Sequence, residues 1–137
     1  MSVANDLAET VLRHWLKTNG YSVSKTRAYG ENGVDVIARR GREALYIEVI
    51  GYSSKPSKRA RDFFEAFFRA VSRLKDGANF CVIAMPEEYG RGLKQRAAQY
   101  DIAWRRIGVA FPELSIWLVN CAPGSCAIRA FTWNDWL

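Results

Sequence analysis

The stretch that decides the fold of this chain is Gly33-Val-Asp-Val-Ile-Ala-Arg-Arg-Gly-Arg-Glu-Ala-Leu-Tyr-Ile-Glu-Val-Ile-Gly51. It contains two apolar runs, residues 34–38 and 44–50, with the basic segment Arg-Arg-Gly-Arg between them. This pattern predicts two β-strands joined by a basic hairpin. Each strand carries one acidic residue among β-branched neighbours, Asp35 in the first strand and Glu48 in the second.

Acidic residues are costly in such strands. A carboxylate in a β-core must be paired, hydrogen-bonded or bound to a metal, because an isolated buried charge is strongly unfavourable. Two carboxylates on adjacent strands can share a hard divalent cation such as Mg²⁺, which binds through few protein oxygens and keeps several waters. Asp35 and Glu48 are therefore candidate metal ligands.

The segments Gly33-Val-Asp-Val-Ile-Ala38 and Tyr46-Ile-Glu-Val-x-Gly51 resemble the motif of the PD-(D/E)XK nuclease superfamily. Within it the chain is most similar to Mrr-type nucleases and archaeal Holliday junction resolvases. The resemblance implies a restriction-endonuclease-like fold in which Asp35 and Glu48 bind Mg²⁺, with Mn²⁺ as a substitute. Together they would orient the water that attacks a DNA phosphodiester.

The sequence departs from this motif at Ile50, which stands where the family has a lysine. A lysine there would share the strand face of Glu48 and could hold the attacking water or stabilise the charged transition state. An isoleucine can do neither. Two interpretations remain open: the role of the lysine has moved elsewhere in the chain, or this nuclease fold no longer cuts.

A basic segment follows the second strand and leads into a helix expected over about residues 57–76. It should lie near the two carboxylates, and both the helix N-terminus and the neutralisation of phosphates favour contact with DNA. A solvated loop is the alternative. The basic residues of this segment are Lys55, Lys58, Arg59 and Arg61. Lys55 and Lys58 are the leading candidates for a relocated catalytic lysine.

Two further groups of site candidates flank the motif. Lys25 and Arg27 lie on a strand expected over residues 21–28 and can face the same cleft, where they would contact DNA. Glu9 lies on a first helix expected over residues 5–19, capped by Asn5 or Asp6 and stopped by Gly20. Glu9 is either an acid favoured by the helix dipole or, as the resemblance implies, a carboxylate that joins the metal site through a water.

The remaining elements complete an α/β pattern. We expect a strand over residues 79–85, a single helix over about 87–106, and closing strands over 115–120 and 127–132. The helix over residues 57–76 should pack its apolar positions on the sheet, and these are Ala60, Phe63, Phe64, Phe67, Val71 and Leu74. The order α-β-β-β-α-β-α-β-β matches a three-layer core with a mixed central sheet flanked by helices.

Length and composition bound the other expectations. The 137 residues suit one domain, residues 1–137. The 20 Lys and Arg residues outnumber the 14 Asp and Glu residues, and the net charge of +6 favours a polyanionic partner such as DNA, with solvated surface charge as the alternative. There is no signal peptide pattern and no apolar run near the roughly 18 residues that a membrane span requires, so we expect a cytoplasmic protein without membrane contact.

Three functions follow from these observations. The first is a Mg²⁺-dependent endodeoxyribonuclease that uses Glu9, Asp35, Glu48 and a relocated lysine. The second is a catalytically inactive module that binds DNA through its basic face. The third is a structural or interaction subunit that docks through its aromatic tail, residues 131–137. We expect this tail to cover the edge of the core, and the alternative is a homodimer contact.

Overall fold

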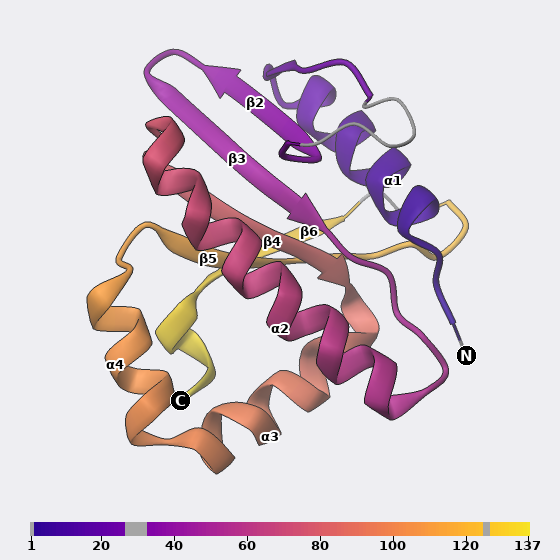
Figure 1. The fold of residues 1–137 in the computed structure, drawn as a ribbon. Coiled ribbons are helices and arrows are strands. Elements are labelled where there is room, and N and C mark those ends of the chain that lie inside the picture. The colour runs from indigo at the N-terminus through magenta and orange to yellow at the C-terminus, as the bar shows by residue number, and fades with distance from the viewer. Residues whose placement is uncertain (1, 27–32, 125–126) are drawn as a thin grey trace.

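A computed structural model describes residues 2–26, 33–124 and 127–137 of the chain. Six strands form one sheet in the order β1-β2-β3-β4-β5-β6 (Figure 1). The strands are β1 (Ser22–Val23), β2 (Val36–Arg40), β3 (Glu43–Val49), β4 (Phe80–Pro86), β5 (Leu114–Val119) and β6 (Ile128–Thr132). The helices are α1 (Asn5–Thr18), α2 (Pro56–Ser72), α3 (Gly90–Tyr100) and α4 (Ile102–Ala110), with short 3₁₀ turns η1 (Arg73–Asp76), η2 (Glu87–Tyr89) and η3 (Trp133–Trp136).

The sheet is mixed. Antiparallel pairs join β1 to β2, β2 to β3, and β5 to β6, whereas β3, β4 and β5 are parallel. The parallel strands are connected through α2 and through α3 with α4, as parallel strands require. The predicted α/β class and the restriction-endonuclease-like order of elements are confirmed. In the part of the chain that the structure describes, no helix has the length and apolar character needed to cross a membrane.

Helix α1 covers one face of the sheet. Its residues Ala8, Leu12 and Leu16 are fully buried against a cluster from β2 to β5 that includes Val36 and Ile47. Helical periodicity places these three residues on one face of α1. The predicted cap is wrong, because Ala4 precedes the helix and no described side chain caps it.

Helix α2 covers the opposite face and shares it with α3, α4 and η3. Phe63 is buried there, in a cluster that also contains Ile83 and Ile116. Phe64 was expected in the core but is 42% exposed, and Phe68 is 71% exposed. The apolar face of α2 is therefore wider than the surface that the sheet covers.

The expected helix over residues 87–106 is broken. The chain forms η2, α3 and α4, and α3 ends at Tyr100 because the next residue, Asp101, has φ 43 and ψ −102, which are not helical. The break turns Trp104 onto the C-terminal segment, where its ring stacks on that of Trp133 at a centroid distance of 4.0 Å. Each indole N–H donates to the other residue's carbonyl oxygen, at 2.8 Å and 2.9 Å. Trp133 is buried, so this part of the tail covers the core as expected.

The edge strand β1 is shorter than expected. The strand expected over residues 21–28 is the two-residue β1, and Arg27 lies outside the described residues.

The segment after β3 is fixed to the N-terminal segment. Tyr52 pairs with Val3 through two backbone hydrogen bonds of 2.8 Å and 2.7 Å. This bridge fixes the segment that leads from β3 to α2.

Candidate active site

Asp35 and Glu48 lie opposite each other at the start of β2 and the end of β3. The register pairs Val36 with Ile47. The next pair along this antiparallel ladder is therefore Asp35 with Glu48, and directly opposed side chains lie on the same face of a sheet. The two side chains lie close enough for the charge of Asp35 to raise the pKa of Glu48, and Asp35 Oδ2 accepts a bond of 2.8 Å from the backbone N–H of Val49. The two carboxylates that the sequence singles out therefore meet.

The environment of Glu48 disfavours its ionised form. Glu48 is 3% exposed. Burial, followed by the charge of Asp35, raises the pKa of Glu48 to about 7, although the guanidinium groups of Arg73 and Arg69 oppose the shift. Two adjacent carboxyl groups in a dry site hold a proton between them because both cannot ionise at low cost. A divalent cation would relieve the same repulsion.

Arg73 is a site residue that the sequence analysis did not identify. It lies in η1, directly after α2, and its Nε is 3.4 Å from Glu48 Oε1. Neither of these two buried atoms has a hydrogen-bond partner among the described residues, so the contact is an ion pair without hydrogen-bond geometry. Arg73 also pairs with Asp76 at 3.1 Å. The raised pKa of Glu48 shows that this loose pair does not compensate for burial.

The donors present fit a hard divalent cation. Both are carboxylates, and the buried Oε1 of Glu48 has no hydrogen-bond donor within the described ranges. The same ranges contain no cluster of three or more His, Cys, Asp or Glu residues with metal-binding geometry. A site with so few protein ligands leaves most positions to water and phosphate, which suits Mg²⁺ better than Zn²⁺.

A small hollow of about 80 Å³ lies beside the end of β3. It is lined by Asn5, Val49, Ile50, Lys58, Asp62, Glu65 and Arg69. Ile50 is buried in the core on the α2 side, so the position of the family's lysine is filled by an apolar side chain. Lys58 lines the same hollow, and its Nζ is 2.7 Å from Asp62 Oδ2. Lys55 precedes α2 and is exposed.

Glu9 is connected to the site through Arg13. The carboxylate of Glu9 is 2.8 Å from Nε of Arg13. The guanidinium of Arg13 donates to the carbonyl oxygen of Asp35 at 3.0 Å and to that of Ser24. Arg13 therefore ties α1 to the chain at Asp35, and Glu9 orients Arg13. The i, i+4 spacing of Glu9 and Arg13 was a signal for this pair in the sequence.

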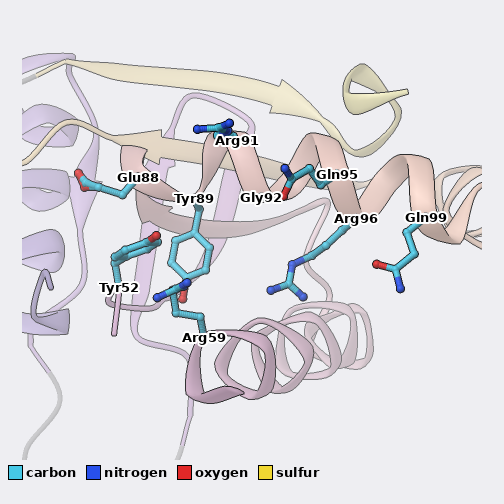
Figure 2. A pocket seen from close by; sticks show the side chains of 9 residues that line it. All are labelled: Tyr52, Arg59, Glu88, Tyr89, Arg91, Gly92, Gln95, Arg96 and Gln99. Carbon is cyan, nitrogen blue, oxygen red and sulfur yellow. The ribbon is translucent and has the colours of Figure 1, made fainter. Parts of the chain in front are cut away.

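The other predicted basic residues do not gather at the carboxylates. Lys25 and Arg61 are exposed. Arg59 turns toward Tyr52, with its guanidinium 4.6 Å from the ring centroid, and donates to the Ser53 carbonyl at 2.8 Å. It lines a separate cleft between α2 and α3 (Figure 2). The segment expected to form one basic cluster thus divides between two hollows.

The raised pKa of Glu48 predicts a pH-dependent stability in metal-free buffer. The folded-state pKa of about 7 lies above the ordinary value of 4.5. The folded state therefore binds the proton more tightly than the unfolded state, and stability falls as pH rises through this window. The neutral isostere Glu48→Gln should remove this loss, making the variant more stable than the wild type by roughly 2–3 kcal/mol at pH 8.

Urea denaturation in EDTA at several pH values from 5 to 8 measures this difference. The control is Glu87→Gln, which removes a partly exposed carboxylate paired with Arg129 on the surface. It should follow the wild-type pH profile. Parallel profiles for Glu48→Gln and the wild type would show that Glu48 ionises normally.

Comparison with known protein families identifies a match to most of the chain. Residues 4–103 match the family model Mrr_cat, described as a restriction endonuclease. The matched range contains α1, both carboxylate-bearing segments, α2, Arg73 and α3. No curated protein and no solved structure matches the chain significantly.

Proposed function

The chain belongs to the restriction endonuclease family, and from this premise we propose that it hydrolyses DNA phosphodiester bonds with Mg²⁺ held by Asp35 and Glu48. Mn²⁺ would serve as a substitute. The observation that supports the proposal is the pair of carboxylates that the β2–β3 register places opposite each other, one of them buried. Such a pair costs stability in the free protein, and a cation offsets that cost.

The roles of the two carboxylates differ. When bound, the divalent ion polarises the scissile phosphate and lowers the pKa of the attacking water. Asp35 is held in place by the N–H of Val49 and by the bond from Arg13 to its carbonyl oxygen. Glu48 must release its proton to solvent before both groups carry charge. Glu9 keeps Arg13 oriented toward Asp35 and, in this proposal, holds a water at the site.

Lys58 is the candidate for the relocated lysine that the geometry favours over Lys55. It lines the hollow beside Ile50, and its bond with Asp62 joins an exposed amine to its i+4 neighbour. Pairs of this kind are worth only about 0.3–0.5 kcal/mol, so the amine can turn to a phosphate at little cost. Arg69 and Arg73 add positive charge around Glu48. Lys55, Arg61 and Lys25 would contact the DNA backbone.

A second function is favoured by Ile50 and Arg73. A buried isoleucine at the lysine position and a guanidinium beside Glu48 are what a DNA-binding module without cutting activity would contain. This alternative predicts DNA affinity that is the same in EDTA and in Mg²⁺. It also predicts no cleavage. A homodimer would bring a second copy of either site to the other strand of a duplex.

Incubation of the purified chain with labelled single-stranded, duplex and branched DNA tests the proposed activity. We expect cleavage of at least one substrate in Mg²⁺ or Mn²⁺ and none in EDTA, because two carboxylates alone cannot stabilise the charge on a phosphodiester transition state. Gel electrophoresis of the products measures it. Intact DNA under every metal and substrate combination would select the binding module.

A further inference from the structure

A cleft separate from the carboxylate pair lies between α2 and α3. Its volume is about 420 Å³, within the range of pockets that hold small ligands. It is lined by Tyr52, Arg59, Glu88, Tyr89, Arg91, Gly92, Gln95, Arg96 and Gln99. It lies beyond the carboxyl ends of the parallel strands β3 and β4, where α/β sheets commonly bind ligands.

Two arginines line this cleft from opposite helices. Arg59 extends from α2 and Arg96 from α3 into the space between the helices (Figure 2). Aromatic rings hold both guanidinium groups: Arg59 lies over Tyr52, and Arg96 lies 5.5 Å from the centroid of Phe63. Contact with a ring face positions a guanidinium and leaves most of its five N–H donors available.

Neither of these two arginines is neutralised by a carboxylate at ion-pair distance in the described part of the chain. Six described arginines have a carboxylate within ion-pair distance, and these are Arg13, Arg40, Arg69, Arg73, Arg105 and Arg129. Within the described ranges, neither Arg59 nor Arg96 forms an ion pair, and Arg59 donates only to the Ser53 carbonyl. Two cations that line one cleft repel each other, and an anion bound between them would relieve this repulsion.

Glu88, an acidic residue that lines the cleft, does not neutralise the two arginines. The carboxylate of Glu88 points away from Arg59 and Arg96 in Figure 2. It faces Cys121 instead, since its charge contributes to the raised pKa of that thiol. The first turn of α3, with Gly92, also borders the cleft and adds the positive end of a helix dipole. The cleft is therefore suited to an anionic ligand.

We propose that this cleft binds the phosphate group of a nucleotide between Arg59 and Arg96, with Gln95 and Gln99 contacting the sugar or base. Paired guanidinium forks match the geometry of phosphate oxygens. A third hollow, lined by Gly51, Tyr52, Ser53, Lys58 and Asp62, shares Tyr52 with the cleft and Lys58 with the hollow beside Glu48. A strand bound at the carboxylates could thus follow these hollows. The assignment of the nucleotide to such a strand rests on the proposed function.

Binding assays in EDTA test this site without requiring cleavage. One arm measures the fluorescence anisotropy of a labelled single-stranded oligonucleotide across a range of salt concentrations. The other arm measures the shift in the unfolding temperature caused by millimolar dAMP. Arg96→Gln should weaken oligonucleotide binding about tenfold and reduce the salt slope by about 0.7, the value for one phosphate contact on a single strand.

Matched variants separate the cleft from general charge effects. Arg106→Gln on α4 removes the same charge from an exposed site and should change affinity less than about twofold. Gln99→Glu adds a carboxylate to the cleft from an exposed position, which keeps the test valid if Arg96→Gln fails to fold. It should weaken binding, whereas Ala98→Glu, exposed on the same helix, should not.

The two arms identify the source of the phosphate. If Arg96→Gln and Gln99→Glu weaken oligonucleotide binding but keep the dAMP shift, the cleft binds the backbone of a strand. If they also abolish the shift in unfolding temperature caused by dAMP, the cleft binds a free nucleotide. Equal effects of the cleft variants and their controls, or unchanged binding in both arms, would overturn the proposal. None of these results depends on whether the protein cuts DNA.

Discussion

Asp35→Ala and Glu48→Ala will each reduce metal-dependent DNA cleavage by at least about a thousandfold, while DNA binding in EDTA stays intact. The side chains of these residues lie opposite each other on one face of the β2–β3 edge, and in the proposed mechanism they are the protein's donors to the cation. Loss of either ligand removes the charge that stabilises the transition state, a cost of about 4 kcal/mol. Single-turnover cleavage with saturating enzyme measures the effect.

The double variant provides the sharper comparison. Residues that act as a unit are strongly non-additive, so Asp35→Ala/Glu48→Ala should cut no more slowly than either single variant. Glu87→Gln, a change on the surface, should retain wild-type activity. Independent effects that multiply in the double variant, or single losses below about tenfold, would mean that the two carboxylates do not share one ion.

Trp133→Ala will lower the free energy of unfolding by about 3–5 kcal/mol. Trp133 stacks on Trp104 and on Phe63, at centroid distances of 4.0 Å and 6.1 Å. Its indole N–H also donates to the Trp104 carbonyl within the core. The substitution leaves a large cavity and a buried carbonyl without this donor. Urea denaturation at one pH measures the loss.

Trp136→Ala is the matched control for this prediction. Trp136 lies in the same C-terminal turn and packs against Phe131, but it is only half-buried. Its substitution should cost less than half as much as Trp133→Ala. A loss below about 1 kcal/mol for Trp133→Ala would show that the C-terminal turn is not part of the core. That result would restore the interpretation of the tail as a docking element.

The central hairpin could be predicted because strand periodicity assigns faces directly. The two apolar runs and the basic hairpin predicted adjacent strands with one carboxylate on each, and the antiparallel register makes Asp35 and Glu48 neighbours on one face. The burial of Leu12 and Leu16 on α1 followed from helical periodicity in the same way. These features depend on residues close in sequence, so local pattern contains the information.

The rest of the site depends on where distant elements meet. Arg73 reaches Glu48 only because α2 lies back along β3, and no local pattern gives that direction. Lys58 and Arg59 are consecutive, yet successive helical residues point about 100° apart, so they line different hollows. The break at Asp101 was hidden because its neighbours continue an acceptable helical pattern. The basic residues of segment 55–61 therefore do not form one cluster, since Lys58 and Arg59 line different hollows.

Diffraction from crystals of the protein soaked in Mn²⁺ tests the central claim most directly, since the anomalous signal locates the ion. We predict a peak between Asp35 and Glu48, with both carboxylates directed toward the ion and Arg73 displaced from Glu48. An empty map at this position, with Arg73 still beside Glu48, would contradict the account.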